Sequence, residues 1–491
     1  MNKFIFILIL VLPIFAAAQI DTTAYLYAYG GLGNDIAEDI EPTHDGGYII
    51  VGSTASSGDG NTDIYLLKVD SLCNYQWSKA LGGTNNDWGY SVKQTYDKGY
   101  MIAASSNSYG DSYQACLFKR DSLGEYEWMG AYGGADWDLV YDVVQTHDSG
   151  FAFCGETYNN TAGFSDVYIV RTNNLGDTLW TQKIGGSLID KGNAIIETQD
   201  SSIVVAGIRT TLTDSTQAYI IKLDKNGTLL WDSIYGGTEY EWVNDLVESF
   251  PNNYTIAGST NSNSNGDLNY YVLNVDPQGN QNWEFSIVNP PTPSPDNDEL
   301  YAIGKSVNNR LVFTGSYMTD GGGKKNLGFF TLTYDGLWAG ESMVLGTEED
   351  DYLRSVYVNA QKRMVGAGQT NSFGNGNWDA LVFRMDSIYW NNDTILTVKH
   401  DIAPIGQKEE VHFNEIKVYP NPTHSMVTIS IDHNAKNYQF QLTDVLGREW
   451  LKSDNIKNSS TIDVSSLPKQ VYIYNIIKNK TILKTGKLII H

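Results

Sequence analysis

The chain has 491 residues, of which 47 are glycine and 12% are aromatic, a composition typical of turn-rich β proteins and not of helical ones. Its 33 basic and 57 acidic residues give a formal net charge of −24, which argues against nucleic acid as a partner, because phosphate binding needs basic patches. Only three cysteines occur, without a CxxC spacing, so neither a disulfide framework nor a thiolate metal site is expected.

The N-terminal segment has the pattern of an export signal. Lys3 precedes an apolar run from Phe4 to Phe15, and Ala16–Ala18 follow it. This order is typical of a signal peptide over residues 1–18, whereas the alternative is a buried terminal helix or strand. Cleavage there would leave Gln19, which is not a cysteine, so no lipid anchor is expected. No other stretch is long and apolar enough for a transmembrane segment.

Residues 22–395 contain an internal repeat. Four extended segments alternate with tight turns in each unit, and in the first unit they lie near Ile36–Glu41, Tyr48–Ser53, Ile64–Val69 and Tyr75–Ala80. Each unit ends with a tryptophan segment, and a glycine pair follows most of them. The tryptophans recur at steps of 51 to 55 residues, as Trp77, Trp128, Trp180, Trp231, Trp283, Trp338 and Trp390. We expect seven four-stranded antiparallel sheets.

Such sheets must stack, because a four-stranded sheet of this size cannot bury both faces alone. An open solenoid and a closed propeller both satisfy this need. The segment Ala24–Gly31 (AYLYAYGG) matches the end of the other units, and we expect it to complete the last sheet and remove a free edge. The seventh unit has its own short segment, Asp386–Trp390, which either competes with that strand or lies outside it.

The repeat also resembles a known group. The stretches Thr43–Thr54 and Asp63–Asp70, with Trp77 and Tyr132–Gly134, are similar to bacterial β-propeller repeats of the kelch-like and delta-60 groups. The resemblance covers residues 22–395 and implies an all-β, seven-bladed β-propeller of four-stranded antiparallel blades. It says little about activity, because propellers carry many functions.

Two acidic patterns are candidate cation sites. One acid recurs in every unit, five residues after the first glycine of the pair or its equivalent, at Asp35, Asp87, Asp138, Asp190, Glu241, Asp298 and Asp351. A ring of carboxylates could bind a divalent ion, but recurrence in every unit favours a structural role, as acceptors of backbone N–H groups. The second pattern, Asp59, Asn61 and Asp63, has alternate oxygen ligands as in a calcium loop but lacks its distal glutamate. No other cofactor is expected.

Four tryptophans break the symmetry of the repeat near loop-to-strand junctions: Trp88, Trp137, Trp242 and Trp378. Exposed indoles of this kind stack on sugars or anchor a protein partner. The alternative, which we favour, is packing between neighbouring blades.

No catalytic constellation is readable in the propeller region. Its histidines, His44 and His147, occupy the same turn of two units and have no evident serine or cysteine partner. We therefore expect a non-enzymatic binding or adhesion module that engages glycan or protein through the propeller loops. One alternative is a polysaccharide hydrolase or lyase, which would bring two or more blade-specific acids and a basic residue to one channel mouth. Another is a structural role in the cell surface or in gliding.

The pattern changes after Trp390. Residues 396–414 read as a linker, and residues 415–491 form a compact β pattern with a net charge of +4, from nine lysines and Arg448 against six acids. Its strands are expected near Met426–Ile431, Tyr438–Thr443, Val471–Ile477 and Ile482–Ile490.

Three motifs in residues 415–491 resemble the type A C-terminal sorting domain of the Bacteroidota type IX secretion system. They contain Tyr419, Pro420, Asn421 and Pro422, then Asp444 and Gly447, then Asp463 and Leu467. The resemblance implies a small immunoglobulin-like β-sandwich, an outer-membrane translocon and a sortase as partners, and export to the cell surface or beyond. Gln470 stands where the family commonly has glycine, which puts the local turn in doubt. The alternative is an ordinary terminal sandwich that binds cargo or sugar.

Overall fold

The computed structural model describes residues 23–159, 164–212, 215–250, 252–262, 267–287, 297–306, 309–318, 324–345, 349–386, 395–400, 417–419, 425–430, 438–444, 448–456, 459–478 and 481–490. Over these residues the chain consists of strands and turns without a helix. It divides into two compact units, Met1–Glu410 and Val411–His491. The expected signal peptide, residues 1–18, lies outside the described residues.

The described part of the first unit forms seven sheets, which we number as blades in chain order. Blades 1 to 6 each contain four consecutive antiparallel strands. Blade 1 contains β2 (Asp35–Pro42), β3 (Tyr48–Thr54), β4 (Asp63–Val69) and β5 (Tyr75–Leu81). Blade 2 contains β6 (Asp87–Gln94), β7 (Tyr100–Ser106), β8 (Gln114–Arg120) and β9 (Tyr126–Tyr132). Blade 3 contains β10 (Asp138–Gln145), β11 (Phe151–Thr157), β12 (Asp166–Thr172) and β13 (Thr178–Ile184).

The later blades follow the same order. Blade 4 contains β14 (Asp190–Glu197), β15 (Ile203–Thr210), β16 (Thr216–Leu223) and β17 (Leu229–Tyr235). Blade 5 contains β18 (Glu241–Phe250), β19 (Asn253–Thr260), β20 (Asn269–Val275) and β21 (Gln281–Ile287). Blade 6 contains β22 (Glu299–Ser306), β23 (Arg310–Met318), β24 (Lys325–Thr333) and β25 (Trp338–Leu345). Blade 7 contains β26 (Asp351–Val358), β27 (Met364–Thr370), β28 (Asp379–Met385), β1 (Thr23–Tyr29) and β29 (Ile395–His400).

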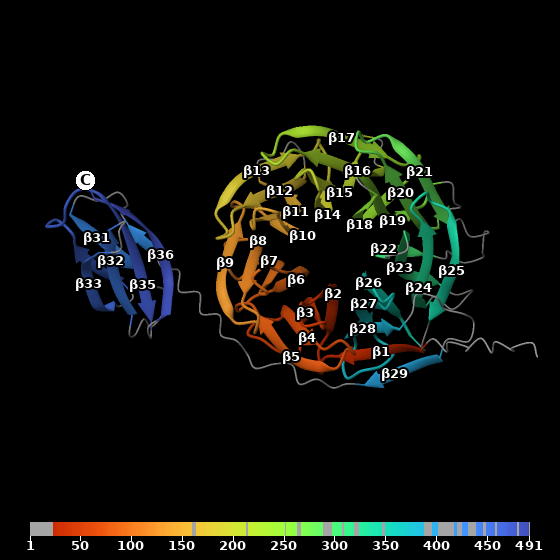
Figure 1. Cartoon of the computed structure of the whole chain (residues 1–491), viewed down its shortest axis with the longest axis horizontal. Helices are drawn as coiled ribbons and strands as arrows, with labels where there is room; N and C mark the ends of the chain where they lie inside the picture. The colour runs from red at the N-terminus through yellow and green to blue at the C-terminus, as the bar shows by residue number, and fades with distance from the viewer. Residues whose placement is uncertain are drawn as a thin grey trace, which may run out of the picture. The chain divides into compact units, whose positions relative to one another are not determined.

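The sheets are arranged as a closed ring (Figure 1), and we call its centre, which the innermost strands surround, the channel. The first strand of each blade is innermost and contacts the innermost strand of the next blade, and β26 contacts β2 to close the circle. The expected all-β class, with repeated four-stranded antiparallel sheets, is confirmed. We call the face of the ring at which the innermost strands start the upper face, and the opposite face the lower face.

The ring is closed by the first described strand. β1 pairs antiparallel with β28, with Ala24 opposite Met385 and Tyr29 opposite Ala380, which gives blade 7 its fourth strand, as the sequence predicts. A fifth strand, β29, pairs parallel with β1. Residues 396–400, which the sequence assigns to the linker, therefore form part of a strand, because β1 offers them a free edge. Of the competing segment Asp386–Trp390, residues 387–390 lie outside the described residues.

The recurring tryptophan joins neighbouring blades. A residue with φ near +60 to +84° lies in the turn before each of these outer strands, four residues before the tryptophan position, at Cys73, Gly124, Gly176, Gly227, Gly279 and Gly336. A Cβ at Gly227 would lie 2.7 Å from the Trp180 ring of the preceding blade, so the indole packs directly on this backbone. Trp231 likewise reaches the next blade and donates from Nε1 to the Pro277 carbonyl oxygen, at 2.9 Å.

Trp338 does not belong to this series, contrary to the sequence interpretation. It lies two residues after Gly336 and is 45% exposed, and Gly340 occupies the tryptophan position. The Trp338 ring instead stacks on Phe330 of its own blade, with 5.9 Å between centroids. In blade 7, β28 pairs with the distant β1 and not with the next strand of the chain.

The second unit is a sandwich of two sheets. One sheet contains β30 (Lys417–Tyr419), β31 (Met426–Ser430) and β34 (Ser459–Asp463), and the other contains β33 (Glu449–Ile456), β32 (Tyr438–Asp444), β35 (Val471–Lys478) and β36 (Thr481–Ile489). Val427 and Ile429 of the first sheet form one buried cluster with Phe440 and Tyr472 of the second. The four expected strands agree with β31, β32, β35 and β36, which confirms the β-sandwich class. No helix in the described ranges of the chain has the length and apolarity needed to cross a membrane.

Candidate ligand site in the propeller channel

Each innermost strand contains a β-bulge at the same position. At the bulge one residue is skipped in the pairing register with the neighbouring strand, as between Ala37 and Asp39 in β2. The skipped residues, which we call the channel ring, are Glu38, Tyr90, Tyr141, Asn193, Asn244, Tyr301 and Arg354. A bulge redirects its side chain. All seven side chains line one cavity of about 120 Å³ in the channel.

The residue after each bulge joins neighbouring blades. It is aspartate in blades 1, 3 and 5, as Asp39, Asp142 and Asp245. Each aspartate accepts the N–H of the next residue in its own strand, at 2.7–2.8 Å. Each also accepts the corresponding N–H of the following blade, at 2.8–3.0 Å. The aspartates therefore satisfy backbone donors that the bulges leave unpaired, and this role is structural.

Lys93 lines the channel cavity and is surrounded by carboxylates. Its Nζ is 3.0 Å from Oδ2 of Asp39. Burial opposes the charge of Lys93, but Asp39, Asp142 and Glu41 outweigh burial and raise the pKa of the lysine. The Ser91 hydroxyl lies 3.2 Å from Asp39 and 2.7 Å from Asp142, and its single hydrogen can serve only one of them.

The carboxyl groups of the channel differ in their preferred charge. Burial works against ionisation of Asp39, but the Lys93 ammonium, the Val92 N–H and the Ser355 hydroxyl outweigh it and lower the pKa. Burial raises the pKa of neighbouring Glu38, although Arg354 partly opposes this effect. Burial also raises the pKa of Asp245 to about 7, with smaller contributions from Asp142 and Asp39. The channel thus holds two neighbouring acids, Asp39 and Glu38, whose pKa values are shifted in opposite directions.

Arg354 is held between two tyrosine rings. Its guanidinium carbon is 4.9 Å from the ring centroid of Tyr301 and 5.4 Å from that of Tyr352. Its Nε lies 3.6 Å from Oε2 of Glu38, across the junction between blades 7 and 1. Cation–π contacts cover the faces of the guanidinium, so its N–H edge is the part that can bind a ligand.

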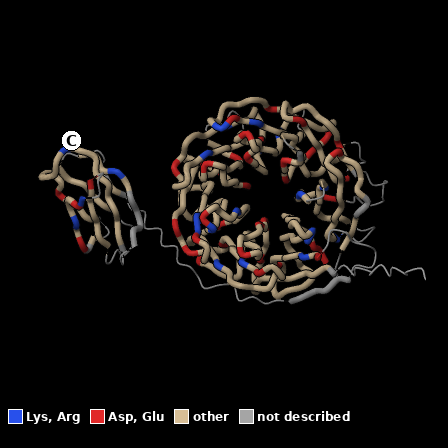
Figure 2. Tube along the Cα trace, in the orientation of Figure 1, with Lys and Arg blue, Asp and Glu red and all other residues tan. Residues whose placement is uncertain are grey.

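The opposite side of the ring presents acceptors. Asn193 donates from Nδ2 to the Val243 carbonyl oxygen at 2.6 Å, and Asn244 donates from Nδ2 to the Leu300 carbonyl oxygen at 2.8 Å. These inter-blade bonds use the amide nitrogens, which leaves the amide oxygens for the channel. Acidic and basic residues both occur on the innermost strands (Figure 2). The cavity therefore combines donors near Arg354 with acceptors near Asn193 and Asn244.

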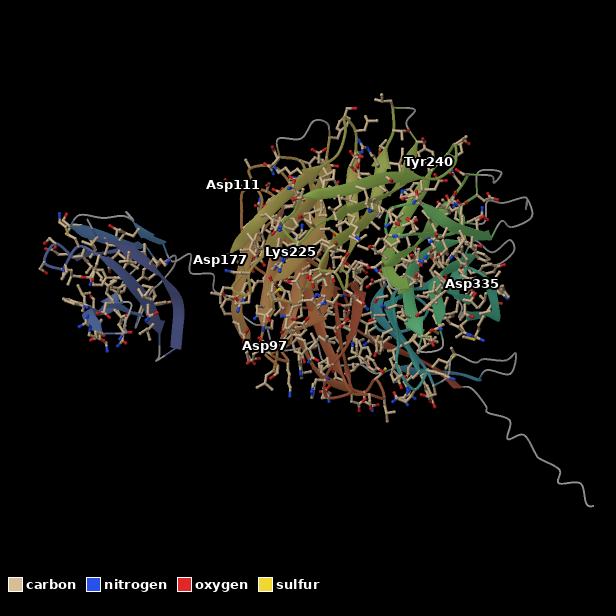
Figure 3. All side chains as sticks on the ribbon, turned by 45° about the horizontal axis from the view of Figure 1, so that its top comes forward. Asp97, Asp111, Asp177, Lys225, Tyr240 and Asp335 are labelled. Carbon is tan, nitrogen blue, oxygen red and sulfur yellow. The ribbon has the colours of Figure 1, made fainter. Side chains whose placement is uncertain are left out.

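The four predicted ligand-binding tryptophans lie on three parts of the upper face. Trp88 and Trp137 belong to one series of rings, in which Tyr113 stacks on Trp88 at 5.3 Å and meets Trp137 edge-on at 5.4 Å. Trp242 stacks on Tyr240, at 5.6 Å, and Tyr240 is labelled in Figure 3. Trp378 meets Tyr352 edge-on at 5.8 Å. The structure thus brings Trp88 and Trp137 together.

The recurring acids at the strand starts are buried and serve their own blades. Asp35, Asp87 and Asp138 are 0% exposed and each accepts the N–H of the second glycine of the preceding pair, at 2.7–2.9 Å. Asp298 accepts the Met318 N–H, at 2.9 Å. These contacts agree with the structural interpretation and not with an open carboxylate ring.

The residues of the candidate calcium loop differ in their exposure to solvent. Asp59 and Asn61 are exposed, whereas Asp63 is buried and accepts the Gly60 N–H at 3.1 Å. Burial raises the pKa of Asp63 to about 6, and Asp87 adds to the effect. Over the described ranges no three His, Cys, Asp or Glu side chains are grouped as a metal would need.

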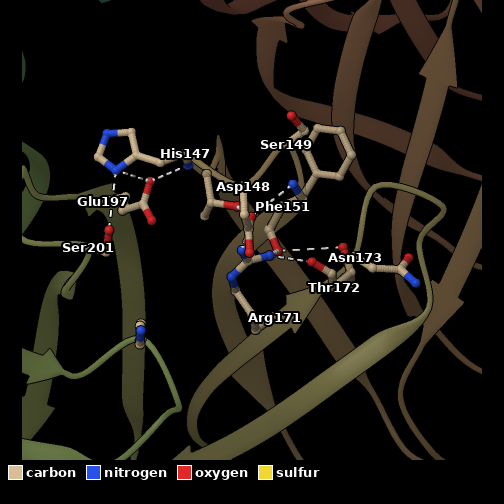
Figure 4. A network of polar contacts seen from close by, with 12 residues as sticks. His147, Asp148, Ser149, Phe151, Arg171, Thr172, Asn173, Glu197 and Ser201 are labelled. Atoms are coloured by element: carbon tan, nitrogen blue, oxygen red, sulfur yellow. Dashed lines mark hydrogen bonds and ion pairs between the residues drawn. The ribbon is translucent and has the colours of Figure 1, made fainter.

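A larger cavity of about 780 Å³ opens between blades 3 and 4 on the lower face, and His147 lies in its wall. Contrary to the sequence interpretation, His147 has a serine partner: its Nδ1 is 3.4 Å from Ser201 Oγ and 3.2 Å from Glu197 Oε2 (Figure 4). Both contacts use the same nitrogen, so the ring cannot relay a proton from serine to glutamate. Ser201 has φ 61°, at a turn position where other blades also have positive φ. The trio thus connects the turn after β10 in blade 3 with the turn after β14 in blade 4.

The sorting motifs of the second unit close turns. Asp444 is 4% exposed and accepts Arg448 N at 3.0 Å, Arg448 Nε at 2.7 Å and Trp450 Nε1 at 3.1 Å. Asp463 accepts the Ser465 N–H at 2.8 Å, and Leu467 packs against the core. Gln470 is not among the residues with positive φ, so its turn does not require glycine. Tyr419 ends β30, while Pro420, Asn421, Pro422 and Gly447 lie outside the described residues.

The fold and its tail define a class of protein: an all-β propeller that carries a C-terminal export domain. Residues 417–491 match the family described as the secretion system C-terminal sorting domain. The second unit is thus the sorting domain of the type IX system, and the protein is exported to the cell surface or beyond. No curated protein shows significant sequence similarity to the chain.

Several solved structures are similar in fold only. PorZ of Porphyromonas gingivalis, a surface component of the type IX secretion system, matches with TM-score 0.32 and 11% identity over 94% of this chain and 74% of PorZ. Sqt1 of Chaetomium thermophilum matches with TM-score 0.42 and 10% identity over 71% and 82%. A puromycin hydrolase matches with TM-score 0.45 and 12% identity over 90% and 59%. Scores this low support no functional argument.

Sequence reasoning missed the channel ring. The signal that could have found it lies three residues after each recurring acid. In chain order these positions hold Glu, Tyr, Tyr, Asn, Asn, Tyr and Arg. These residues are polar or aromatic, and four residue types share the seven positions. In the sequence, a site that takes one residue from each blade can be recognised as a repeat position at which the residue type varies.

Proposed function

We propose that this exported protein is a non-enzymatic binding module of the cell surface whose propeller recognises a polar, hydroxyl-bearing ligand at the channel ring. The observation that carries the proposal is the ring itself, with seven bulged side chains of differing chemistry around one cavity. The structural position at the strand starts, by contrast, is acidic in all seven blades.

The chemistry of the ring fits a polyol such as a sugar. Arg354 and Tyr90 supply donors, and Asn193 and Asn244 supply acceptors, so hydroxyl groups can both give and accept hydrogen bonds there. The cavity of about 120 Å³ holds roughly four waters at about 30 Å³ each. It therefore admits one part of a sugar, and the remainder of the ligand must lie at the channel mouth.

The test is binding of the mature chain to an array of glycans, followed by titration of the hits. Arg354→Gln is expected to weaken binding about 10- to 100-fold, since a charge-assisted hydrogen bond is lost. Arg209→Gln is the matched control, because Arg209 also lies over a tyrosine, Tyr219, at 5.1 Å but outside the channel ring. Equal affinities of the two variants at equal thermal stability would contradict the proposal.

A second candidate function is hydrolysis of a polysaccharide in the channel. It is favoured by one observation: Glu38 and Asp39 have pKa values shifted in opposite directions, which is the arrangement that general acid–base catalysis uses. Release of reducing ends from polysaccharides by the mature chain, abolished by Glu38→Gln and retained by Glu41→Gln, would support it. No release from any substrate that the chain binds would exclude it.

A further inference from the structure

The ring series on the upper face extends beyond the tryptophans that the sequence singles out. It runs from Trp88 through Tyr113 and Trp137 to Tyr158, with successive centroids 5.3, 5.4 and 6.0 Å apart. We call these four residues the aromatic ladder. Its rings come from blades 2 and 3, and Trp137 is 51% exposed.

The ladder and the channel ring share the strand β6. Trp88 precedes the ring residue Tyr90 by two positions in the same strand, β6. Tyr90 meets Tyr141 edge-on at 5.3 Å. Tyr141 in turn donates to Glu156 at 2.6 Å. Strand β6 thus carries both the first ladder residue, Trp88, and a channel-ring residue, Tyr90.

The backbone of the ladder is fixed before any ligand binds. The Tyr158 N–H donates to the Trp137 carbonyl oxygen at 2.8 Å, and the Asp138 N–H donates to the Tyr113 carbonyl oxygen at 2.9 Å. Asn86 Nδ2 donates to the Tyr113 hydroxyl at 3.5 Å. Rings held in place lose little conformational entropy on binding, so their exposed faces are preorganised for contact.

The loops around the ladder indicate the chemistry of the ligand. Residues 82–88, 107–113 and 133–137 contain no lysine or arginine, and Asp111 and Asp136 are exposed. This acidic potential disfavours acidic ligands between Trp88 and Trp137, whereas at the other end Lys183 Nζ lies 2.7 Å from the Asn159 carbonyl oxygen, beside Tyr158. The remaining side chains are largely Asn, Ser and Thr, which bind hydroxyl groups, and Met and Arg, which are common in protein interfaces, are absent. Flat rings with hydroxyl-binding neighbours suit the apolar face and the polar edge of a sugar.

We propose that the aromatic ladder is the binding track for an uncharged glycan chain, whose end enters the channel ring. The inference rests on the proposed function and names its ligand class. One sugar unit occupies the ring mouth, and the following units stack on Trp88, Tyr113 and Trp137. Binding should therefore increase with chain length, because each added ring contact contributes about 0.5–1.5 kcal/mol, which corresponds to about 2- to 12-fold.

The experiment compares the mature chain with two variants by calorimetric titration. The probes are glucose and the hexasaccharides laminarihexaose, cellohexaose, xylohexaose, mannohexaose and chitohexaose, with hexagalacturonate as the acidic counterpart. At least one neutral hexasaccharide is expected to bind, 10-fold or more tighter than glucose and hexagalacturonate. Trp137→Ala should weaken that binding at least 5-fold. Trp450→Ala, which removes a 40% exposed indole of the sorting domain, should leave it unchanged.

The outcomes separate this inference from the proposed function. If Arg354→Gln weakens binding and Trp137→Ala does not, the ladder is wrong and the channel ring stands. If Trp137→Ala weakens binding and Arg354→Gln does not, the ladder stands and the ring is wrong. Binding of hexagalacturonate alone, or of no hexasaccharide, overturns the inference, and binding of a protein at the ladder would do the same.

Discussion

Asp39 and Asp245 occupy the same position in blades 1 and 5, yet their surroundings favour opposite charge states. The pKa of Asp39 is lowered, chiefly because Lys93 and neighbouring donors outweigh burial. The pKa of Asp245 is raised to about 7, because its burial is not offset by a nearby cation. Two substitutions of the same type should therefore act in opposite directions.

Asp39→Asn should destabilise the protein at neutral pH by about 2 kcal/mol, since Lys93 loses its ion pair while it remains largely buried. A lowered folded pKa contributes stability above the unfolded pKa, near 4, and loses it as the pH falls. The difference between variant and wild type should thus shrink below pH 4. Urea midpoints at pH 3.5 and pH 7 measure it, and a constant difference would contradict the assignment.

Asp245→Asn should stabilise the protein at pH 8 by roughly 1–2 kcal/mol, after allowance for a weakened acceptor. A raised folded pKa costs stability as the pH rises from about 4 through about 7, so the gain should vanish at pH 4. Urea midpoints at pH 4 and pH 8 test this. A loss of stability at both values would show that Asp245 is ionised and paired.

The packing of the recurring tryptophan on the glycine turn of the next blade can also be tested at single residues. Gly227→Ala places a methyl group 2.7 Å from the Trp180 ring at φ 83°, and we expect a loss of about 2 kcal/mol. Trp180→Ala removes the ring, so the double variant should cost less than the sum of the single variants. Thermal unfolding of all four proteins gives the coupling, and additive losses would place the strain elsewhere.

Strands could be predicted from the sequence where the same pattern recurs in every unit of the repeat. The four strands of blade 1 were expected within one residue of β2 to β5, because alternating apolar residues and tight turns mark each of them. The closing strand was predictable because AYLYAYGG repeats the end of a unit. The channel ring was not, because a β-bulge without glycine has no local signal and its residues differ. The contact of His147 with Ser201 joins residues 54 apart, which only the packing of blades brings together.

The strand β1 holds the ring closed through buried side chains. Leu26 is 1% exposed and lies in one cluster with Phe329 of blade 6 and Leu381 of blade 7. Leu26→Ala should therefore lower the free energy of unfolding by about 2–4 kcal/mol. Leu229→Ala, at a 44% exposed leucine of β17, is the matched control and should change it by less than about 1 kcal/mol. Equal thermal midpoints for both variants would mean that the buried side chains of β1 do not stabilise the closed ring.

At the scale of the whole molecule, recognition and export are carried by separate units. Deletion of residues 417–491 should leave a folded propeller, because the two units have separate cores. The truncated protein should fail to reach the cell surface. Surface proteolysis and fractionation of the producing cells measure this, with the full chain as control. Surface display of the truncated protein at the level of the full chain would assign the export signal elsewhere.

The five-stranded blade 7 determines the order in which the propeller can fold. Tyr29 is hydrogen-bonded in register with Ala380, so the first strand of the propeller has no sheet to join until nearly the whole ring has been synthesised. Contacts this distant in sequence make folding slow. Until then each chain carries a bare, apolar strand at one end and an uncapped sheet at the other. Two unfinished chains can pair with each other across these ends, so dilution should favour closure of the ring within one chain.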